Sequence, residues 1–177
     1  MKAYWSSFIV SLFVSYTFSQ ESNELELWTY NLGNFVNKHA HKFVASKWPF
    51  TTKAIVGDVV DNYIIDSIEK HNYKVWLYLE TKGYRYAKDK YYKEVEDEAT
   101  NIKKALKLVE NQPEVISFIE RLRLEKRMKS TKLVKINETT YKFSVFSFNI
   151  NDVDVPEKFE FTAEAHIDRN IVLIEGW

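Results

Sequence analysis

Apolar residues recur at the spacing of an α-helix through two consecutive stretches between residues 58 and 110. In the first stretch they are Val60, Tyr63, Ile64, Ile65, Ile68, Val75, Trp76 and Leu79, and in the second Ala87, Tyr91, Val95, Ala99, Ile102, Leu106 and Val109. Such intervals bring the side chains onto one face of a helix, and charged residues fill the opposite face of the second stretch. Asp58 or Asp61 can cap the first helix, and Gly83 can end it. We therefore predict a central helical hairpin joined at Gly83.

The same spacing predicts a further helix on each side of the hairpin. One covers residues 24–47 and ends before Pro49, and the other covers residues 114–129. We expect the second of these helices to bury Val115, Ile116, Ile119, Leu122 and Met128. Between the first helix and the hairpin, residues 53–56 form a short apolar run that is typical of a strand.

Beyond residue 129 the period of the pattern changes to two. Short apolar runs at 133–136 and 141–148 flank a polar turn, and residues 171–174 follow a turn at Arg169-Asn170. Between them Phe159, Phe161, Ala163, Ala165 and Ile167 alternate with Glu160, Thr162, Glu164, His166 and Asp168. This alternation predicts a half-buried antiparallel strand. The sequence thus predicts an α+β domain with a helical part at about 24–129, packed on a three- or four-stranded antiparallel meander at about 132–175.

The first 19 residues have the composition of a cleavable export signal. Lys2 supplies the positive start, an apolar run follows at residues 8–14, and Thr17 and Ser19 are small residues where a signal peptidase reads the chain. The apolar run is short and rich in serine for a segment that must span about 30 Å of hydrocarbon. We predict cleavage after Ser19, a periplasmic or secreted domain of residues 20–177, and no transmembrane span after cleavage.

The composition narrows the possible chemistry. The chain has no cysteine, which excludes disulfides, thiol nucleophiles, iron–sulfur clusters and zinc–thiolate sites. Its 25 basic and 25 acidic residues balance, so the net charge gives no attraction to nucleic acid or membrane. Four glycines are too few for phosphate-binding loops, and the sequence holds no Walker, dinucleotide, nucleophile-elbow or zinc-protease motif. A basic run at 121–135 is interrupted by acidic residues and lacks interleaved aromatic residues, which favours a solvated helix end over nucleic-acid binding. We expect no cofactor.

The central stretch resembles a known family of small exported Bacteroidota domains. The residues that carry the resemblance are His71-Asn72-Tyr73-Lys74-Val75, Leu79-Glu80 and Lys90-Tyr91-Tyr92-Lys93-Glu94-Val95-Glu96. They are similar to the FEKKY domain over about a third of the chain, although the Phe-Glu-Lys-Lys-Tyr motif of that name is not intact and Leu79-Glu80-Thr81-Lys82-Gly83 is the nearest run. The resemblance implies a bacterial envelope setting and carries no activity with it.

Histidine and carboxylate side chains offer candidates for a site in two places. On a helix, His39 and His41 point about 200° apart and cannot share a metal ion, whereas in an extended chain a carboxylate could complete a zinc site with them. We favour the helix. His166 lies between Glu164 and Asp168 on the polar face of its strand, where the three could perform acid–base chemistry, and we favour a solvated sheet face.

A third candidate is an oxygen-rich loop at residues 149–157, which holds several Asn and Asp residues. It lacks the glycine that an EF-hand calcium loop needs at its bend. Asn and Asp are also common turn-forming residues, so the composition favours a plain hairpin loop over a calcium site.

Three hypotheses of function remain. The first is a non-enzymatic exported module that binds a protein or another envelope component. Its binding surface would be the polar face of the sheet or the exposed aromatic residues of the hairpin, notably Tyr84, Tyr86 and Tyr92. The second is a small hydrolase or metal-dependent enzyme that uses the histidine and carboxylate positions above. The third is a carrier that holds a small apolar ligand in a cavity between the helices and the sheet.

Overall fold

The predicted α+β class is confirmed by a computed structural model, which describes residues 25–30, 34–56, 61–149 and 155–176. The elements in chain order are β1 (Glu26–Tyr30), α1 (Phe35–Ala45), β2 (Thr51–Val56), α2 (Asn62–Thr81), α3 (Ala87–Glu110), α4 (Pro113–Leu124), β3 (Met128–Asn137), β4 (Thr140–Phe148), β5 (Lys158–His166) and β6 (Ile171–Glu175). The predicted signal segment and the centre of the oxygen-rich loop lie outside the described residues.

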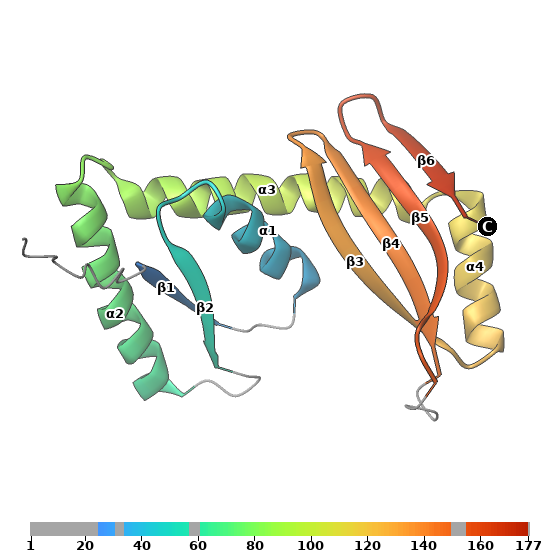
Figure 1. Cartoon of the computed structure of the whole chain (residues 1–177), viewed down its shortest axis with the longest axis horizontal. Coiled ribbons are helices and arrows are strands. Elements are labelled where there is room, and N and C mark those ends of the chain that lie inside the picture. The colour runs from blue at the N-terminus through green and yellow to red at the C-terminus, as the bar shows by residue number, and fades with distance from the viewer. Residues whose placement is uncertain (1–24, 31–33, 57–60, 150–154, 177) are drawn as a thin grey trace, which may run out of the picture.

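Helix α3 runs along the length of the molecule and carries a different layer at each end (Figure 1). At its N-terminal end lie α1, α2 and the two short strands β1 and β2, and at its C-terminal end lie the four-stranded sheet and α4. Its buried residues are Ala87, Tyr91, Val95, Glu98, Ala99, Ile102, Ala105 and Val109. The apolar stripe predicted for this helix is therefore confirmed, except that Leu106 is only half-buried.

The single helix predicted over residues 24–47 is wrong in its first part. Residues Glu26–Tyr30 form β1, which pairs in parallel with β2, and the helix begins only at Phe35. Asn34 marks this start, because its side-chain oxygen accepts the backbone N–H groups of Val36 at 3.0 Å and Asn37 at 3.3 Å. Leu27 is the residue of β1 that is fully buried. The strand predicted at 53–56 is confirmed and begins two residues earlier.

The junction between α2 and α3 follows the prediction at both ends of α2. Asp61 caps its start by accepting the N–H of Ile64 at 2.8 Å, and Gly83 follows its end with a φ of +92°. The N–H of Tyr84 reaches the carbonyl of Leu79 at 3.1 Å, which closes a Schellman turn. In Figure 1, however, α2 is steeply inclined to α3, so the two helices meet near the turn and then diverge.

The C-terminal sheet is antiparallel throughout, in the order β3-β4-β5-β6. A bulge interrupts the pairing of β4 with β5, because Val145 lies opposite Phe161 and Phe146 opposite Phe159, leaving Glu160 without a partner residue. The extra residue reverses the predicted alternation: Phe159 is 48% exposed and Glu160 only 8%. Beyond the bulge, the predicted burial of Ala163 and Ala165 is confirmed.

Helix α4 is shorter than predicted and turns a different face to the core. It ends at Leu124, because the chain enters β3 at Met128. Its buried residues are Val115, Phe118 and Leu122, whereas Ile116, Ile119 and Met128 are 48%, 41% and 49% exposed. The predicted burial of these last three residues is therefore wrong. Phe118 packs edge-on against Phe161 of β5, with ring centroids 5.1 Å apart, and so sets the rotation of the helix.

The bulge places the buried Glu160 carboxylate among hydrogen-bond donors. Ser147 donates to it at 2.6 Å, and the Arg121 guanidinium lies at 2.8 Å. Burial acts to raise the pKa of Glu160, but the hydrogen bond from Ser147 and the positive charges of Lys158 and Arg121 outweigh it and hold this pKa below its usual range.

This lowered pKa predicts acid sensitivity. The folded protein binds the Glu160 proton less readily than the unfolded chain, so the stabilisation is present above the unfolded pKa of about 4.3 and is lost as pH falls through the folded pKa. Urea unfolding of Glu160→Gln and of the wild type between about pH 2.5 and 6 tests this. The variant should lose less stability on acidification. Glu138, whose pKa is also lowered, is present in both proteins and cancels in the comparison. Parallel curves would contradict the prediction.

Candidate functional site

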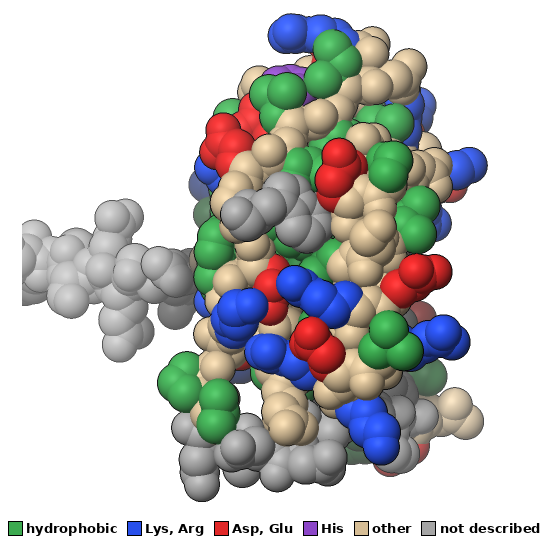
Figure 2. Space-filling view, turned by 90° about the vertical axis from the view of Figure 1, so that its right-hand side faces the viewer, with side chains coloured by type: hydrophobic (Ala, Val, Ile, Leu, Met, Phe, Trp, Pro, Cys, Tyr) green, Lys and Arg blue, Asp and Glu red, His purple; other side chains and the backbone are tan. Residues whose placement is uncertain are grey.

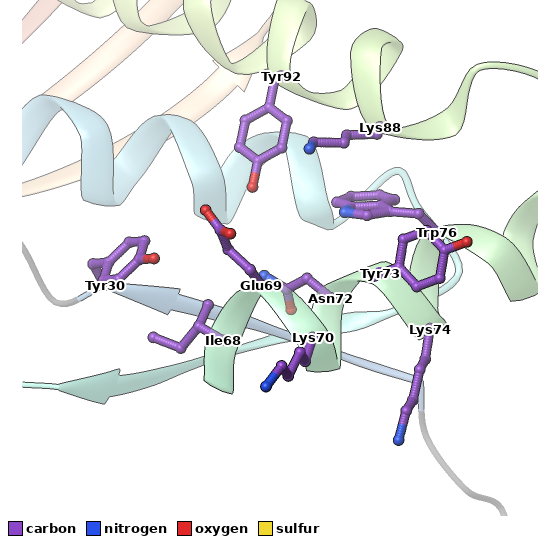
Figure 3. A pocket seen from close by; sticks show the side chains of 10 residues that line it. All are labelled: Tyr30, Ile68, Glu69, Lys70, Asn72, Tyr73, Lys74, Trp76, Lys88 and Tyr92. Atoms are coloured by element: carbon purple, nitrogen blue, oxygen red, sulfur yellow. The ribbon is translucent and has the colours of Figure 1, made fainter. Parts of the chain in front are cut away.

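The opening between α2 and α3 is a groove of about 770 Å³, which we call the aromatic groove (Figure 3). Helix α2 supplies most of its lining, α3 supplies Lys88 and Tyr92, and the end of β1 supplies Tyr30. The residues that line it are Tyr30, Ile68, Glu69, Lys70, Asn72, Tyr73, Lys74, Trp76, Lys88 and Tyr92. Its volume lies within the range of small-molecule and peptide side-chain sites, and its lining mixes aromatic rings with charges of both signs.

Three polar groups meet in the aromatic groove without a hydrogen-bond or ion-pair partner among the described residues. Tyr92 reaches from α3 toward Glu69 on α2, and Tyr30 lies on the other side of Glu69 (Figure 3). Burial raises the pKa of Tyr92, and the neighbouring Tyr30 and Glu69 raise it further. Burial also raises the pKa of Tyr30, with a contribution from the Glu69 charge. Within the described parts of the chain, neither hydroxyl nor the Glu69 carboxylate has a hydrogen bond or ion pair, so all three are available to a ligand.

Helix α2 fixes β1, and thereby Tyr30, through two side chains. The Asn72 side chain accepts the backbone N–H of Trp28 at 2.9 Å and donates to the carbonyl of Trp28 at 2.8 Å. His71 is the residue before Asn72, and its Nε2 donates to the carbonyl of Glu26 at 2.7 Å, since a carbonyl can only accept. The His71 ring also stacks on Trp28, with centroids 3.9 Å apart and planes 6° apart. Strand β1 is therefore held against α2 by hydrogen bonds from its backbone to the Asn72 and His71 side chains and by the stacking of His71 on Trp28.

A second cavity of about 370 Å³ lies over the two-stranded sheet beside α1, and we call it the α1 cavity. It is lined by Trp28, Thr29, Tyr30, Asn37, Lys38, His41, Lys42, Thr52, Ala54 and Tyr92. Tyr30 and Tyr92 line both spaces, so the two are neighbours. Within the described ranges no acidic residue contributes to this lining, and Lys38 and Lys42 are exposed.

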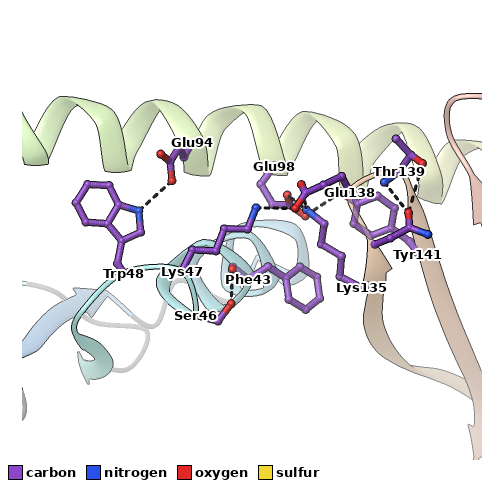
Figure 4. Close-up of polar contacts among 11 residues, drawn as sticks. Phe43, Ser46, Lys47, Trp48, Glu94, Glu98, Lys135, Glu138, Thr139 and Tyr141 are labelled. Carbon is purple, nitrogen blue, oxygen red and sulfur yellow. Dashed lines mark hydrogen bonds and ion pairs between the residues drawn. The ribbon is translucent and has the colours of Figure 1, made fainter.

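The three tyrosines predicted as a binding surface lie in different surroundings. Tyr92 lines the aromatic groove. Tyr84 lines a separate space of about 490 Å³ beside Trp48, whose indole N–H donates to Glu94 at 2.9 Å (Figure 4). Tyr86 is 71% exposed, precedes α3 with a left-handed φ of 56°, and lines none of these three spaces. The structure therefore does not bring the three together.

The cluster predicted around His166 forms only in part. His166 Nε2 lies 3.0 Å from Glu164, and its Nδ1 lies 3.2 Å from the Thr140 hydroxyl. Asp168 is further along the turn, where it contacts Arg169 at 3.6 Å. A carboxylate, an imidazole and a hydroxyl in series resemble a nucleophile array. Thr140, however, is only 3% exposed, so its hydroxyl is buried, and His166 lines none of the cavities described above.

His39 and His41 both lie on α1, as expected, and each is engaged locally. His39 Nδ1 donates to the carbonyl of Phe35 at 2.8 Å, one turn back. His41 Nδ1 lies 2.9 Å from the Tyr91 hydroxyl. Burial lowers the pKa of both histidines, although the Phe35 carbonyl acts to raise that of His39. Among the residues that the structure describes, no group of three or more His, Asp or Glu is arranged to hold a metal ion.

The basic run of the sequence does not produce a patch of one sign. Figure 2 shows the end of the molecule that carries α4 and β6, where Lys and Arg side chains are interspersed with Asp and Glu. Arg121 in this run is paired with Glu160, and Lys129 lies 3.7 Å from Glu110. Of the helices in the described ranges, none is long and apolar enough to cross a membrane.

Sequence reasoning identified Tyr92 but missed Tyr30 and Glu69. Tyr30 was assigned to a helix, and Glu69 is one of many charged residues on the polar face of α2, so no local signal distinguished either residue. No protein-family model matches the chain, and neither a curated protein nor a solved structure is significantly similar to it. The resemblance to the FEKKY domain stays a prediction.

Proposed function

We propose that this chain is a non-enzymatic exported binding module that captures a protein or another cell-envelope component in the aromatic groove. The observation that carries the proposal is the meeting of Tyr30, Glu69 and Tyr92 in a groove of about 770 Å³ with their polar groups unpaired among the described residues. Aromatic rings offer apolar contact area at low conformational cost, while the hydroxyls and the carboxylate select orientation. Export is proposed from the N-terminal signal pattern.

The other two hypotheses draw less support. The hydroxyl beside His166 is buried, which argues against the enzyme hypothesis. A cavity between α3, α4 and the sheet, lined by residues such as Leu106, Val109 and Phe143, measures about 20 Å³. This space holds about one water molecule, so it gives no support to a carrier of an apolar ligand.

Substitution of Tyr92 tests the proposal. Tyr92→Ala should weaken capture of the ligand from bacterial envelope extract by at least about tenfold, because a central aromatic contact typically contributes about 2 kcal/mol. Glu69→Ala should also weaken it. Tyr86→Ala is the matched control, since Tyr86 is an exposed tyrosine of the same helix junction that lies outside the groove. The measurement is titration of immobilised wild-type and variant protein with fractionated extract. Equal retention by wild type, Tyr92→Ala and Glu69→Ala would overturn the proposal.

A further inference from the structure

The two-stranded sheet has two outer edges, and only that of β1 is covered by α2. The backbone N–H of Thr51 donates to the carbonyl of Leu25 at 2.8 Å, which establishes that odd-numbered residues of β1 and β2 face each other across the ladder. Glu26 and Trp28 therefore direct their backbone groups away from β2. These are the groups that the His71 and Asn72 side chains satisfy.

In the part of the chain that the structure describes, no helix or strand pairs with the outer edge of β2. By the same alternation, Thr52 and Ala54 direct their N–H and C=O groups away from β1. Neither residue has a backbone hydrogen bond to another described element, and the sheet contains only two strands within the described ranges. Ala54 and Ile55 are exposed. The edge therefore offers two donors and two acceptors in the spacing of a β-ladder.

The β3 edge of the other sheet is protected more strongly than the β2 edge. Strand β3 carries three lysines, Lys129, Lys132 and Lys135, against one in β2, and lysines on an edge strand are a common means of preventing strand addition. The pairing of β2 with β1 is regular as far as Ala54 and shifts after it, because Val56 and not Ile55 lies opposite Tyr30. The one lysine of β2, Lys53, lies 3.5 Å from Glu26 of the neighbouring strand, so its charge is directed back over the sheet.

The α1 cavity adjoins this edge and contributes positive charge beside it. Thr52 and Ala54 line the cavity together with Lys38 and Lys42 of α1, and none of the described residues that line it is acidic. Among the described residues, Lys38 and Lys42 have no ion-pair partner. A strand added to β2 would turn alternate side chains toward this basic space. A second copy of β2, Thr51–Val56, carries no acidic residue and would not complement it.

We propose that β2 accepts an extended acidic segment of a partner protein as a third strand. Backbone hydrogen bonds to Thr52 and Ala54 would hold the segment, and Asp or Glu side chains of the segment would lie near Lys38 and Lys42. The α1 cavity shares Tyr30 and Tyr92 with the aromatic groove, but Lys38, Lys42, Thr52 and Ala54 do not line the groove, so variants at these four positions test this inference independently of the proposed function.

Selection from a displayed library of random linear ten-residue peptides tests this inference on the purified full chain. Enriched peptides should carry Asp or Glu at alternate positions. Their binding should fall at least tenfold in Ala54→Pro, because proline removes an N–H that faces solvent and is tolerated at a sheet edge. Ala54→Val is the matched control, since it keeps the N–H. Hydrogen exchange gives a second measurement should the proline variant not fold: the bound peptide should slow exchange of the Thr52 and Ala54 amides in the wild type.

Charge reversal separates acidic-peptide binding from other outcomes. Lys42→Glu should weaken binding of the selected peptides at least fivefold, whereas Lys103→Glu should not, since Lys103 is an exposed lysine of α3 that lines none of the cavities described above. The inference is overturned if no acidic peptide is enriched, or if binding protects neither the Thr52 nor the Ala54 amide. It is also overturned if Ala54→Pro abolishes a concentration-dependent dimer instead, since β2 would then pair with a second copy.

Discussion

Replacement of Glu98 by alanine is expected to lower the free energy of unfolding by about 3–5 kcal/mol, because it leaves a buried cation without its closest counter-charge. Glu98 lies on α3, and its side chain is 7% exposed. It lies 2.6 Å from the Lys135 ammonium of β3 and accepts the Tyr141 hydroxyl of β4 at 2.8 Å (Figure 4). The side chain of Lys135 is itself only 10% exposed.

Glu94→Ala is the matched control for this substitution. Glu94 lies one turn earlier on the same helix and accepts a single hydrogen bond from Trp48, but it is exposed. Its loss should cost no more than about 1 kcal/mol. Urea unfolding at neutral pH measures both variants. If Glu98→Ala and Glu94→Ala prove equally mild, Glu138, which also contacts Lys135 at 3.0 Å, must compensate the lysine charge on its own.

The Glu98 cluster also shows why polar burial was not foreseen. The pattern of α3 places Glu98 next to Ala99 on the border of the apolar stripe, where a glutamate is ordinarily solvated. Only the approach of β3 and β4, some forty residues later in the chain, encloses it. Sequence periodicity predicts which face of a helix is buried, but it contains no information on which distant strand supplies a partner for a polar residue at the edge of that face.

The same limit explains the two main errors in the fold. Leu25 and Trp28 have the spacing of a helix, yet the segment pairs with β2 more than twenty residues later, and a short apolar stretch fits either structure. In β5 the alternation of Phe159 and Phe161 was regular in the sequence, and the bulge at Glu160 became visible only in the pairing with β4. Strand partners decide both cases, and a single sequence does not specify them.

The candidate site was predicted least well, because it is assembled from three elements that are distant in sequence. Tyr30 comes from the end of β1, Glu69 from α2 and Tyr92 from α3. Exposed tyrosines on the helices made Tyr92 a candidate, but this signal ranked it equally with Tyr86, which lines none of the cavities described above. What distinguishes Tyr92 is the divergence of α2 from α3, which opens the groove on one side of the junction.

Replacement of Tyr91 by alanine is expected to destabilise the N-terminal half of the molecule by about 3–5 kcal/mol, the usual cost of removing a large aromatic side chain from a core. Tyr91 is fully buried on α3 and is the centre of a ring cluster. Its ring centroid lies 5.6 Å from that of Trp48, 5.2 Å from that of Phe50 and 5.6 Å from that of Trp76, and its hydroxyl contacts His41. These partners come from α1, the segment before β2, and α2.

The position of this cluster determines how the effect should spread. Backbone amides of α1, α2 and β1 should lose protection from hydrogen exchange in Tyr91→Ala, whereas those of β4 and β5 should keep it, because that sheet packs on the other end of α3. Tyr91→Phe should cost only about 1–2 kcal/mol, since it keeps the ring and removes only the hydrogen bond to His41. A uniform loss of protection in Tyr91→Ala would mean that the two ends unfold as one unit. A local loss would make the N-terminal half, which holds the aromatic groove and the β2 edge, a unit with its own stability.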